Sequence, residues 1–295
     1  MSGLEHIRAR LGELTNKQRS IAEYILGAPE EVSYLSLKEL SRRSGASEVS
    51  VLRLCKALGF DSFIALKEAL QAYTREAMQA ISPPSFLENA GRSVSGGPAQ
   101  ALQAICADDL RNLTDMIGGL DADRLFACAR GLLQADEVLV FAHDGTKIFA
   151  DYLCYRLNFL RIKTSGVKLG DSDTVQTVLA RLKKTDYVIL LSFPPYHLPI
   201  YNIASYCRYR GTPILAITDS PDSPASGEGS DVFLCGTSAR YFYNSQVATA
   251  SFINILTSCI AVEMGPRFDE ILAEEQNVSD FMSGGRANDI GGQNE

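Results

Sequence analysis

Two kinds of hydrophobic pattern divide this chain. Over the first 80 residues, apolar side chains recur three or four positions apart, which is the spacing of helices that bury one face. Farther along, apolar residues form short continuous runs separated by helical patterns, at 137–142, 161–166, 186–193, 213–218 and 231–235. Continuous apolar strands that alternate with helices are typical of a parallel sheet covered on both faces. The pattern predicts an all-α head and an α/β body, a three-layer sandwich around a five-stranded parallel sheet.

The segment 36–60 predicts two short helices joined by a tight turn. Ser36 and Glu39 have the spacing of a capping box that begins the first helix. Gly45 supplies the left-handed position that ends this helix, and Ser47 caps the next one. Along the second helix an apolar stripe follows helical spacing, at Val51, Leu54, Cys55 and Leu58. Two short helices with a glycine-containing turn are the signature of a helix-turn-helix.

The polar face of the second helix carries side chains that can contact DNA. Arginine and lysine reach guanine edges or phosphates, and serine reaches either. The predicted DNA-binding residues lie on this face, at its cap and at the end of the first helix: Ser47, Val49, Ser50, Arg53, Lys56, Arg42 and Arg43. An ordinary helical hairpin with a solvated charged face is the alternative that the spacing alone leaves open.

Further helices are predicted around this hairpin. Thr15 and Gln18 have capping-box spacing before a helix that ends at Gly27, and a fifth helix is predicted to be capped by Asp61. The buried stripe of the fifth helix is predicted at Phe63, Leu66, Leu70 and Tyr73. Five short helices over residues 3–80 predict a compact bundle.

Three stretches of the head occur in a specific order: LTNKQRSIAEYIL, LSLKELSRRSGASEVSVLRLCKALGF and FIALKEAL. In these stretches and their order the head resembles the N-terminal domain of RpiR-type bacterial transcription regulators. The resemblance implies that the helix-turn-helix binds operator DNA. It also implies that Ser47, Ser50 and Arg53 lie on the recognition helix, because they match the family's Ser-x-x-Ser/Thr-x-x-Arg pattern.

Composition and charge limit the classes of protein that fit. A chain of 295 residues has room for two domains, and its net charge of -7 is unevenly spread. Residues 1–80 carry 11 Lys and Arg against 10 Asp and Glu, so a local basic stripe can still bind phosphates. The seven cysteines include no C-x-x-C pair, so we expect reduced, mostly buried cysteines in a cytoplasmic protein, with no disulfide, metal or cofactor. The chain has no apolar run of 18 residues and no secretory signal, so we expect no membrane partner.

The predicted domains are the head at 1–80, a linker rich in proline, glycine and serine at 81–97, the body at 98–282 and a disordered tail at 283–295. Two helices are predicted before the first strand, and a last helix over 243–264. This last helix is apolar nearly all round, which is typical of a helix buried between subunits. We therefore expect a homodimer or a higher homo-oligomer.

The order and spacing of the elements over 98–264 resemble a sugar isomerase (SIS) domain. The resemblance implies ligand loops after the first and third strands. The first loop corresponds to His143, Asp144, Gly145 and Thr146. The second loop, at 192–197, keeps only Ser192 of the family's Ser-x-Ser-Gly-x-Thr pattern. Phe193, Tyr196 and Arg240 complete the predicted ligand-binding residues.

The second loop predicts a ligand other than a simple phosphosugar. Gly145 and Thr146 begin a helix, whose free N–H groups favour an anion. Pro194 and Pro195 have no N–H to donate, and the glycine that lets the backbone approach a phosphate is missing. We expect a carboxylate or a neutral polar ring, unless Arg240 supplies the missing donors.

The sequence predicts a transcription regulator that is not an enzyme. A dimer would place two recognition helices on a near-palindromic DNA operator, and a small-molecule effector in the body would modulate binding. His143 and His197 lie in the two ligand loops, but neither loop contains a Glu for proton transfer, so no catalytic residue is predicted. Two alternatives stay open: an SIS-fold sugar-phosphate isomerase with a helical appendage, and a dimeric DNA-binding protein that binds no ligand.

Overall fold

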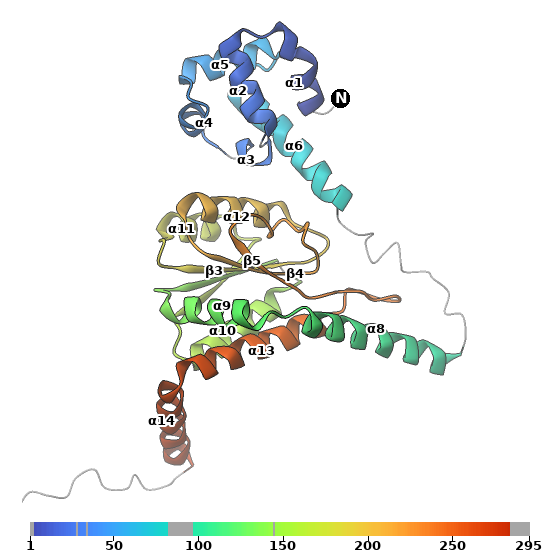
Figure 1. Ribbon diagram of the computed structural model, residues 1–295, viewed down its shortest axis with the longest axis vertical. Helices are drawn as coiled ribbons and strands as arrows, with labels where there is room; N and C mark the ends of the chain where they lie inside the picture. The colour runs from blue at the N-terminus through green and yellow to red at the C-terminus, as the bar shows by residue number, and fades with distance from the viewer. Residues whose placement is uncertain (1–2, 28, 34, 82–96, 144, 284–295) are drawn as a thin grey trace, which may run out of the picture.

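The structure is a computed structural model that describes residues 3–27, 29–33, 35–81, 97–143 and 145–283. It consists of a helical head and an α/β body, as the sequence predicts (Figure 1). The predicted linker at 81–97 and tail at 283–295 lie almost wholly outside the described residues, so both stay predictions.

Helices make up the head. They are α1 (Gly3–Arg10), the 3-10 turn η1 (Leu11–Glu13), α2 (Asn16–Gly27), α3 (Pro29–Val32), α4 (Leu37–Arg43), α5 (Glu48–Ala57) and α6 (Phe63–Ile81). Their apolar stripes meet in one core, which includes Ile21, Ile25, Leu40, Val51, Leu54, Leu58, Leu66 and Leu70. The turn η1 and the short α3 are additions to the five predicted helices.

Side-chain caps determine where the hairpin helices begin. The Ser36 hydroxyl accepts from the Glu39 N–H at 3.2 Å, and the Glu39 carboxylate accepts from the Ser36 N–H at 2.8 Å, which confirms the capping box. Hydrogen bonds from the Ser36 side chain and backbone favour the ionised carboxylate and lower the pKa of Glu39. Gly45 turns the chain at a φ of 63°, in the left-handed region that side chains with a Cβ rarely adopt.

The last helix of the head has a different cap from the one predicted. Helix α6 begins at Phe63, so Asp61 lies one residue too early to cap it. The Ser62 hydroxyl instead accepts from the Ala65 N–H at 3.1 Å. Asp61 and Ser62 are both good capping residues, so the sequence alone favoured neither strongly.

The body is a three-layer sandwich. Its helices are α8 (Pro98–Gly118), α9 (Ala122–Gln134), α10 (Lys147–Phe159), α11 (Ser172–Arg181), α12 (Leu198–Arg210), α13 (Val247–Met264) and α14 (Pro266–Met282). Its strands are β1 (Val138–Ala142), β2 (Thr164–Lys168), β3 (Tyr187–Ser192), β4 (Ile214–Thr218) and β5 (Ser230–Leu234). All the pairs are parallel, in the order β2-β1-β3-β4-β5, which confirms the predicted sheet.

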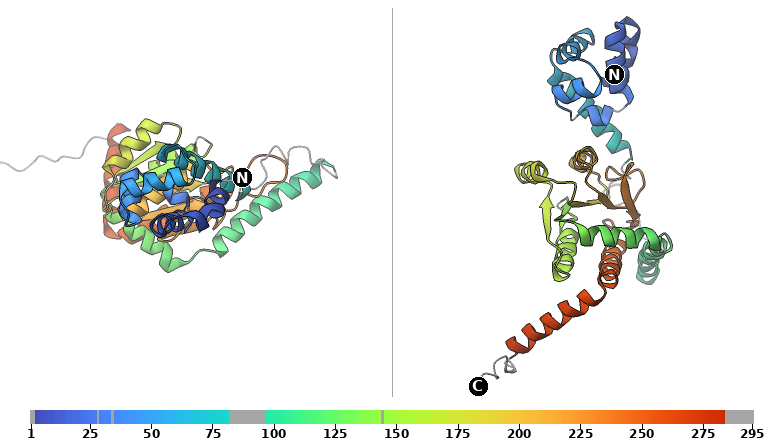
Figure 2. Two further views of the ribbon diagram at one scale, coloured as in Figure 1. Left: turned by 90° about the horizontal axis from the view of Figure 1, so that it is seen from above. Right: turned by 60° about the vertical axis from the view of Figure 1, so that its left-hand side comes forward.

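Each face of the sheet has its own core. Val138 and Val140 point to the face that α9, α10 and α13 cover, whereas Leu139 and Phe141 point to the face that α11 and α12 cover. Figures 1 and 2 show these helical layers above and below the sheet, and they show α8 and α14 extending beyond it. The central strands are therefore buried on both sides, which explains their continuous apolar runs.

Two boundaries in the body differ from the prediction. Strand β2 spans 164–168 rather than 161–166, because it lies at the edge of the sheet and only Val167 of its residues is buried. The last predicted helix begins at Val247 rather than at residue 243. The four residues before it form part of a loop instead, and this loop matters for the site.

One described helix, α13, is long and apolar enough to cross a membrane by length and composition. Its Phe252, Leu256 and Ile260 are fully buried in the core that α13 shares with the sheet, α9 and α10. Much of its apolar surface is thus covered within the chain. This reduces the part of the helix that a second subunit would cover.

All seven cysteines are free thiols. Burial raises the pKa of Cys55 in the head to about 11 and that of Cys207 under the sheet to about 12, so both stay protonated at neutral pH. Among the described residues, no group of three His, Cys, Asp or Glu side chains is placed to hold a metal ion.

The cap of α6 gives a stability prediction with its own control. Ser62→Ala should lower the free energy of unfolding by about 1 kcal/mol, because the Ala65 N–H loses its acceptor. Asp61→Ala should change it by less than about 0.5 kcal/mol. Urea unfolding of the two variants, followed by circular dichroism, measures both effects. The reverse order of the two effects would contradict the assignment of the cap to Ser62.

Candidate functional site: a cavity at the strand ends and an exposed helix face

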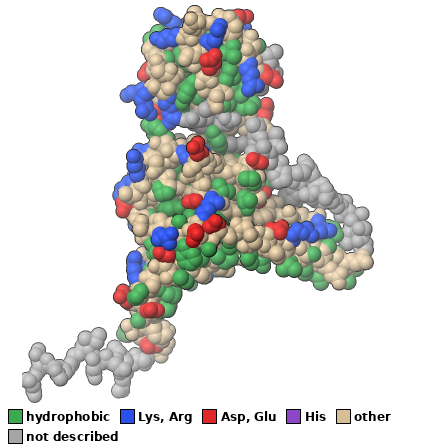
Figure 3. Space-filling view, in the orientation of Figure 1, with side chains coloured by type: hydrophobic (Ala, Val, Ile, Leu, Met, Phe, Trp, Pro, Cys, Tyr) green, Lys and Arg blue, Asp and Glu red, His purple; other side chains and the backbone are tan. Residues whose placement is uncertain are grey.

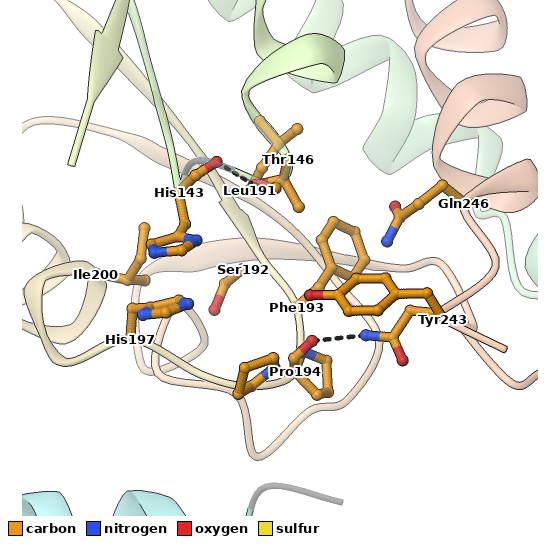
Figure 4. Close-up of a pocket in the computed structure, with 13 residues that line it drawn as sticks. His143, Thr146, Leu191, Ser192, Phe193, Pro194, His197, Ile200, Tyr243 and Gln246 are labelled. Carbon is orange, nitrogen blue, oxygen red and sulfur yellow. Dashed lines mark hydrogen bonds between the residues drawn. The ribbon is translucent and has the colours of Figure 1, made fainter. Parts of the chain in front are cut away.

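The order of the strands creates a crevice at the carboxyl ends of β1 and β3. The chain forms β2 on one side of β1 and then returns to form β3 on the other side. Ligands of open parallel sheets bind at such a switch point, because the loops there diverge. A cavity of about 60 Å³ lies at this point (Figure 4). It is lined by His143, Gly145, Thr146, Leu191, Ser192, Phe193, Pro194, Pro195, His197, Ile200, Tyr243, Asn244 and Gln246.

The loop after β1 supplies three of the predicted ligand-binding residues, His143, Gly145 and Thr146. The fourth, Asp144, lies outside the described residues. The Thr146 hydroxyl donates to the His143 carbonyl at 3.1 Å, and Thr146 directly precedes α10. The N-terminal end of α10 therefore lies at the cavity wall.

The loop after β3 supplies Ser192 and Phe193, which were also predicted, together with the two prolines and His197. Ser192 is buried, and its hydroxyl accepts from the Ser223 hydroxyl at 3.0 Å. Phe193 is buried as well and presents its ring to the cavity in Figure 4. This loop thus contributes mainly apolar surface.

His143 and His197 come from different loops and meet in the cavity wall. Their rings are parallel to within 8°, and their centroids are 3.3 Å apart (Figure 4). The pair therefore provides a flat polar wall to the cavity.

Two predicted ligand-binding residues lie away from this cavity. The Tyr196 hydroxyl donates to Asp219 at 2.8 Å, and burial together with this bond raises the pKa of Tyr196. Arg240 forms a bidentate ion pair with Asp108, at 2.6 and 2.7 Å, and lines a second cavity of about 490 Å³ beside α8. The structure therefore does not bring Tyr196 and Arg240 together with the other predicted ligand-binding residues.

Sequence reasoning missed a third wall of the cavity, because it assigned residues 243–246 to a helix. Tyr243, Asn244 and Gln246 line the cavity from this loop. The Asn244 side-chain amide donates to the Pro194 carbonyl at 2.6 Å, which joins the loop to the one after β3. The Gln246 Oε1 atom is buried and has no hydrogen-bond partner in the described part of the chain. The polar residues at 244–246, directly before the apolar helix, were the signal that could have indicated this loop.

In the head, the structure leaves the predicted recognition face of α5 open. Val49 is 57% exposed, and Arg53 and Lys56 are exposed beside it. The Ser47 hydroxyl accepts from the Ser50 N–H at 3.2 Å, so Ser47 begins the helix as predicted. Val51, Leu54, Cys55 and Leu58 on the other side are buried, as predicted. The helix thus has one face in the core and a polar face toward solvent.

The other two predicted DNA-binding residues contact the body. The Arg43 guanidinium lies 4.9 Å from the ring centroid of Tyr209, near the end of α12. Arg42 donates to the Tyr209 hydroxyl at 3.5 Å. These arginines therefore lie at the boundary between head and body.

Two known protein families match parts of the chain. A helix-turn-helix domain of the rpiR family matches residues 1–77, and an SIS domain matches residues 131–264. The transcriptional regulator HexR of Pseudomonas aeruginosa is 24% identical over 272 residues, which cover 90% of this chain and 91% of that protein. An uncharacterized HTH-type transcriptional regulator of Caldanaerobacter subterraneus is 24% identical over 94% of this chain and 95% of its own.

Solved structures are similar to the body alone and to nearly the whole chain. The sugar isomerase domain of an RpiR transcription factor from Sphaerobacter thermophilus is 28% identical, covers 60% of this chain and 98% of its own, and has a TM-score of 0.55. The Vibrio vulnificus NanR protein, solved in complex with ManNAc-6P, is 18% identical and covers 95% of this chain and 99% of its own, with a TM-score of 0.50.

The ion pair between Asp108 and Arg240 gives a pH-dependent prediction. The hydrogen bond and charge of Arg240 lower the pKa of Asp108, so the folded state binds a proton to this carboxylate less readily than the unfolded state. The resulting stability is present above the ordinary Asp pKa of about 4 and is lost as the pH falls through the lowered pKa. Asp108→Asn should cost about 1 kcal/mol at neutral pH.

Melting temperatures across the pH range check this expectation. The difference between wild type and Asp108→Asn should shrink as the medium becomes acidic. Asp115→Asn, at an exposed position of the same helix, is the matched control and should show little difference at any pH. A gap for Asp108→Asn that is constant with pH would contradict the role of its charge.

Proposed function

We propose that this chain, which belongs to the RpiR-type family of helix-turn-helix transcription regulators with an SIS domain, changes its affinity for operator DNA when a small metabolite binds in its body. The observation that carries this proposal is the presence in one chain of an exposed polar face on α5 and a cavity at the switch point of the sheet. Relatives that are named as transcriptional regulators also support the proposal, because the similarity covers nearly their whole length.

In this proposal α5 enters the major groove, where Arg53 contacts a base edge and Lys56 a phosphate. The Ser50 hydroxyl and the Val49 side chain flank them on the same face. Two such helices in a dimer, about one helical turn of DNA apart, would read a near-palindromic operator. In this proposal the protein acts in the cytoplasm of a bacterial cell.

The cavity at the strand ends is the proposed effector site. NanR was solved with ManNAc-6P, which supports the idea that an SIS domain beside a helix-turn-helix binds a small molecule. An effector can shift DNA affinity only if it binds one arrangement of head and body better than another. Helix α12 is suited to this coupling, because it directly follows His197 in the cavity wall and carries Tyr209 near its other end.

The recognition face is tested by substitution on α5. Arg53→Ala should weaken binding to an operator selected from a random duplex library by roughly 1–3 kcal/mol, because a contact with a base edge is lost. Lys56→Ala should weaken binding to all sequences and flatten the dependence on salt by about one unit. Fluorescence anisotropy over a series of salt concentrations separates the two effects. A correctly folded Arg53→Ala that binds its operator as tightly as wild type would show that the face is assigned wrongly.

Dimerisation through the body is tested on the fragment 98–295, which should sediment as a dimer at micromolar concentration. A groove of about 310 Å³ between α10, α13 and α14 is lined by Tyr155, Phe159, Ala261 and Phe268 among others. Hydrophobic side chains also gather along the lower edge of the body (Figure 3). Tyr155→Glu in the groove should shift the fragment toward monomer. A clean monomer for the unaltered fragment would exclude this interface.

A further inference from the structure

The polar groups around the strand-end cavity indicate the chemical class of its ligand. We infer that the cavity takes a small uncharged molecule with hydroxyl groups, such as an unphosphorylated sugar or cyclic polyol, and that Gln246 accepts a hydrogen bond from one of these hydroxyls. This inference rests on the proposed effector site, and it names the chemistry of the effector.

The room in the cavity suits a compact ligand. About 60 Å³ is available, and a single water needs roughly 10–15 Å³ by this measure. The enclosed part therefore holds a handful of water-sized groups, which matches one side of a polyol ring.

Fixed positive charge is missing from the described lining of the cavity, which contains no Lys or Arg. Lys147, at the beginning of α10, contacts both carboxylate oxygens of Asp151 at 2.6 Å. Arg240 is held by Asp108 beside the other cavity. Binding of a phosphate dianion depends on charge-assisted hydrogen bonds, and these two cations already have carboxylate partners.

Two hydrogen-bond donors at the cavity wall are used within the protein. The Thr146 hydroxyl donates to the His143 carbonyl, and the Asn244 amide donates to the Pro194 carbonyl. Pro194 and Pro195 have no N–H. The N-terminal end of α10 offers only a partial positive charge. These groups therefore leave few donors to a phosphate, which needs several.

Gln246 provides the opposite chemistry, an acceptor that needs a donor. Its Oε1 atom is buried without a hydrogen-bond partner, which is costly unless a bound molecule donates to it. A hydroxyl group can donate to this atom, whereas the oxygens of a phosphate dianion can only accept. Figure 4 shows the Gln246 amide turned toward the Phe193 and Tyr243 rings, whose faces can pack on the C–H groups of a sugar or polyol.

The test uses the full chain and matched pairs of compounds. Glucose, ribose and myo-inositol are each compared with their phosphate esters by titration calorimetry and by thermal shift. We expect at least one unphosphorylated compound to bind at least tenfold more tightly than its phosphate ester. We also expect inorganic phosphate to stabilise the protein no more than chloride at the same ionic strength.

Variants of Gln246 test the contact itself. Gln246→Leu removes the acceptor and should weaken binding of the neutral ligand by about tenfold, which is the effect of one hydrogen bond. Gln246→Glu keeps an acceptor and should bind the neutral ligand within about threefold of wild type. Gln176→Leu, at an exposed position of α11, is the control and should bind as wild type does.

The outcomes separate this inference from the proposed function. Tighter binding of any phosphate ester than of its parent, with weakened binding in Thr146→Val, would overturn the ligand class and leave the effector site standing. Binding of a neutral ligand that Gln246→Leu does not weaken would overturn the role of Gln246. Binding of a neutral ligand through Gln246, with unchanged affinity for operator DNA, would support the ligand class and contradict the proposed function.

Discussion

The reversal of strand order beside β1 is the constraint on which the rest of the body depends. Parallel pairing brings all carboxyl ends to one edge of the sheet, and the chain leaves β1 and β3 toward opposite sides of it. Loops that diverge at this point cannot fill the space between them, so a cavity forms there. His143 and Ser192 line it because of this topology alone. The same edge would offer a ligand site for many other loop sequences, so specificity has to come from the loops themselves.

Most of the fold follows from local patterns in the sequence. The buried strands β1, β3 and β4 have continuous apolar runs because helices cover both of their faces, and their positions were predicted within one residue. The capping box at Ser36 is equally local, because its hydrogen bonds join residues three apart. Strand β2 was misplaced because an edge strand needs few apolar residues and gives only a weak signal.

The cavity was harder to predict than the sheet. Residues that directly follow a strand, such as Gly145 and Phe193, could be assigned from sequence because the strand end fixes their position. The position of Arg240 depends on Asp108, which lies 132 residues earlier in the chain. Gln246 reaches the cavity because α13 begins later than its apolar pattern suggests. Contacts between distant segments leave no periodic pattern in the sequence. The hydrogen bond between Asn244 and Pro194, which joins the third wall to the loop after β3, is one of these contacts.

The energy of the contact between head and body limits how strongly the cavity can control DNA binding through it. A cation–π contact such as that of Arg43 with Tyr209 contributes about 0.5–1 kcal/mol at an exposed site. In the proposed dimer the Arg43–Tyr209 contact would occur twice, so this contact alone would supply about 1–2 kcal/mol, or a factor of 5–30 in affinity. This lies within the usual range of allosteric coupling energies, about 1–3 kcal/mol. In the proposed function, a small movement of α12, which contacts both the cavity and the head, would therefore be sufficient for regulation without any rearrangement of the sheet.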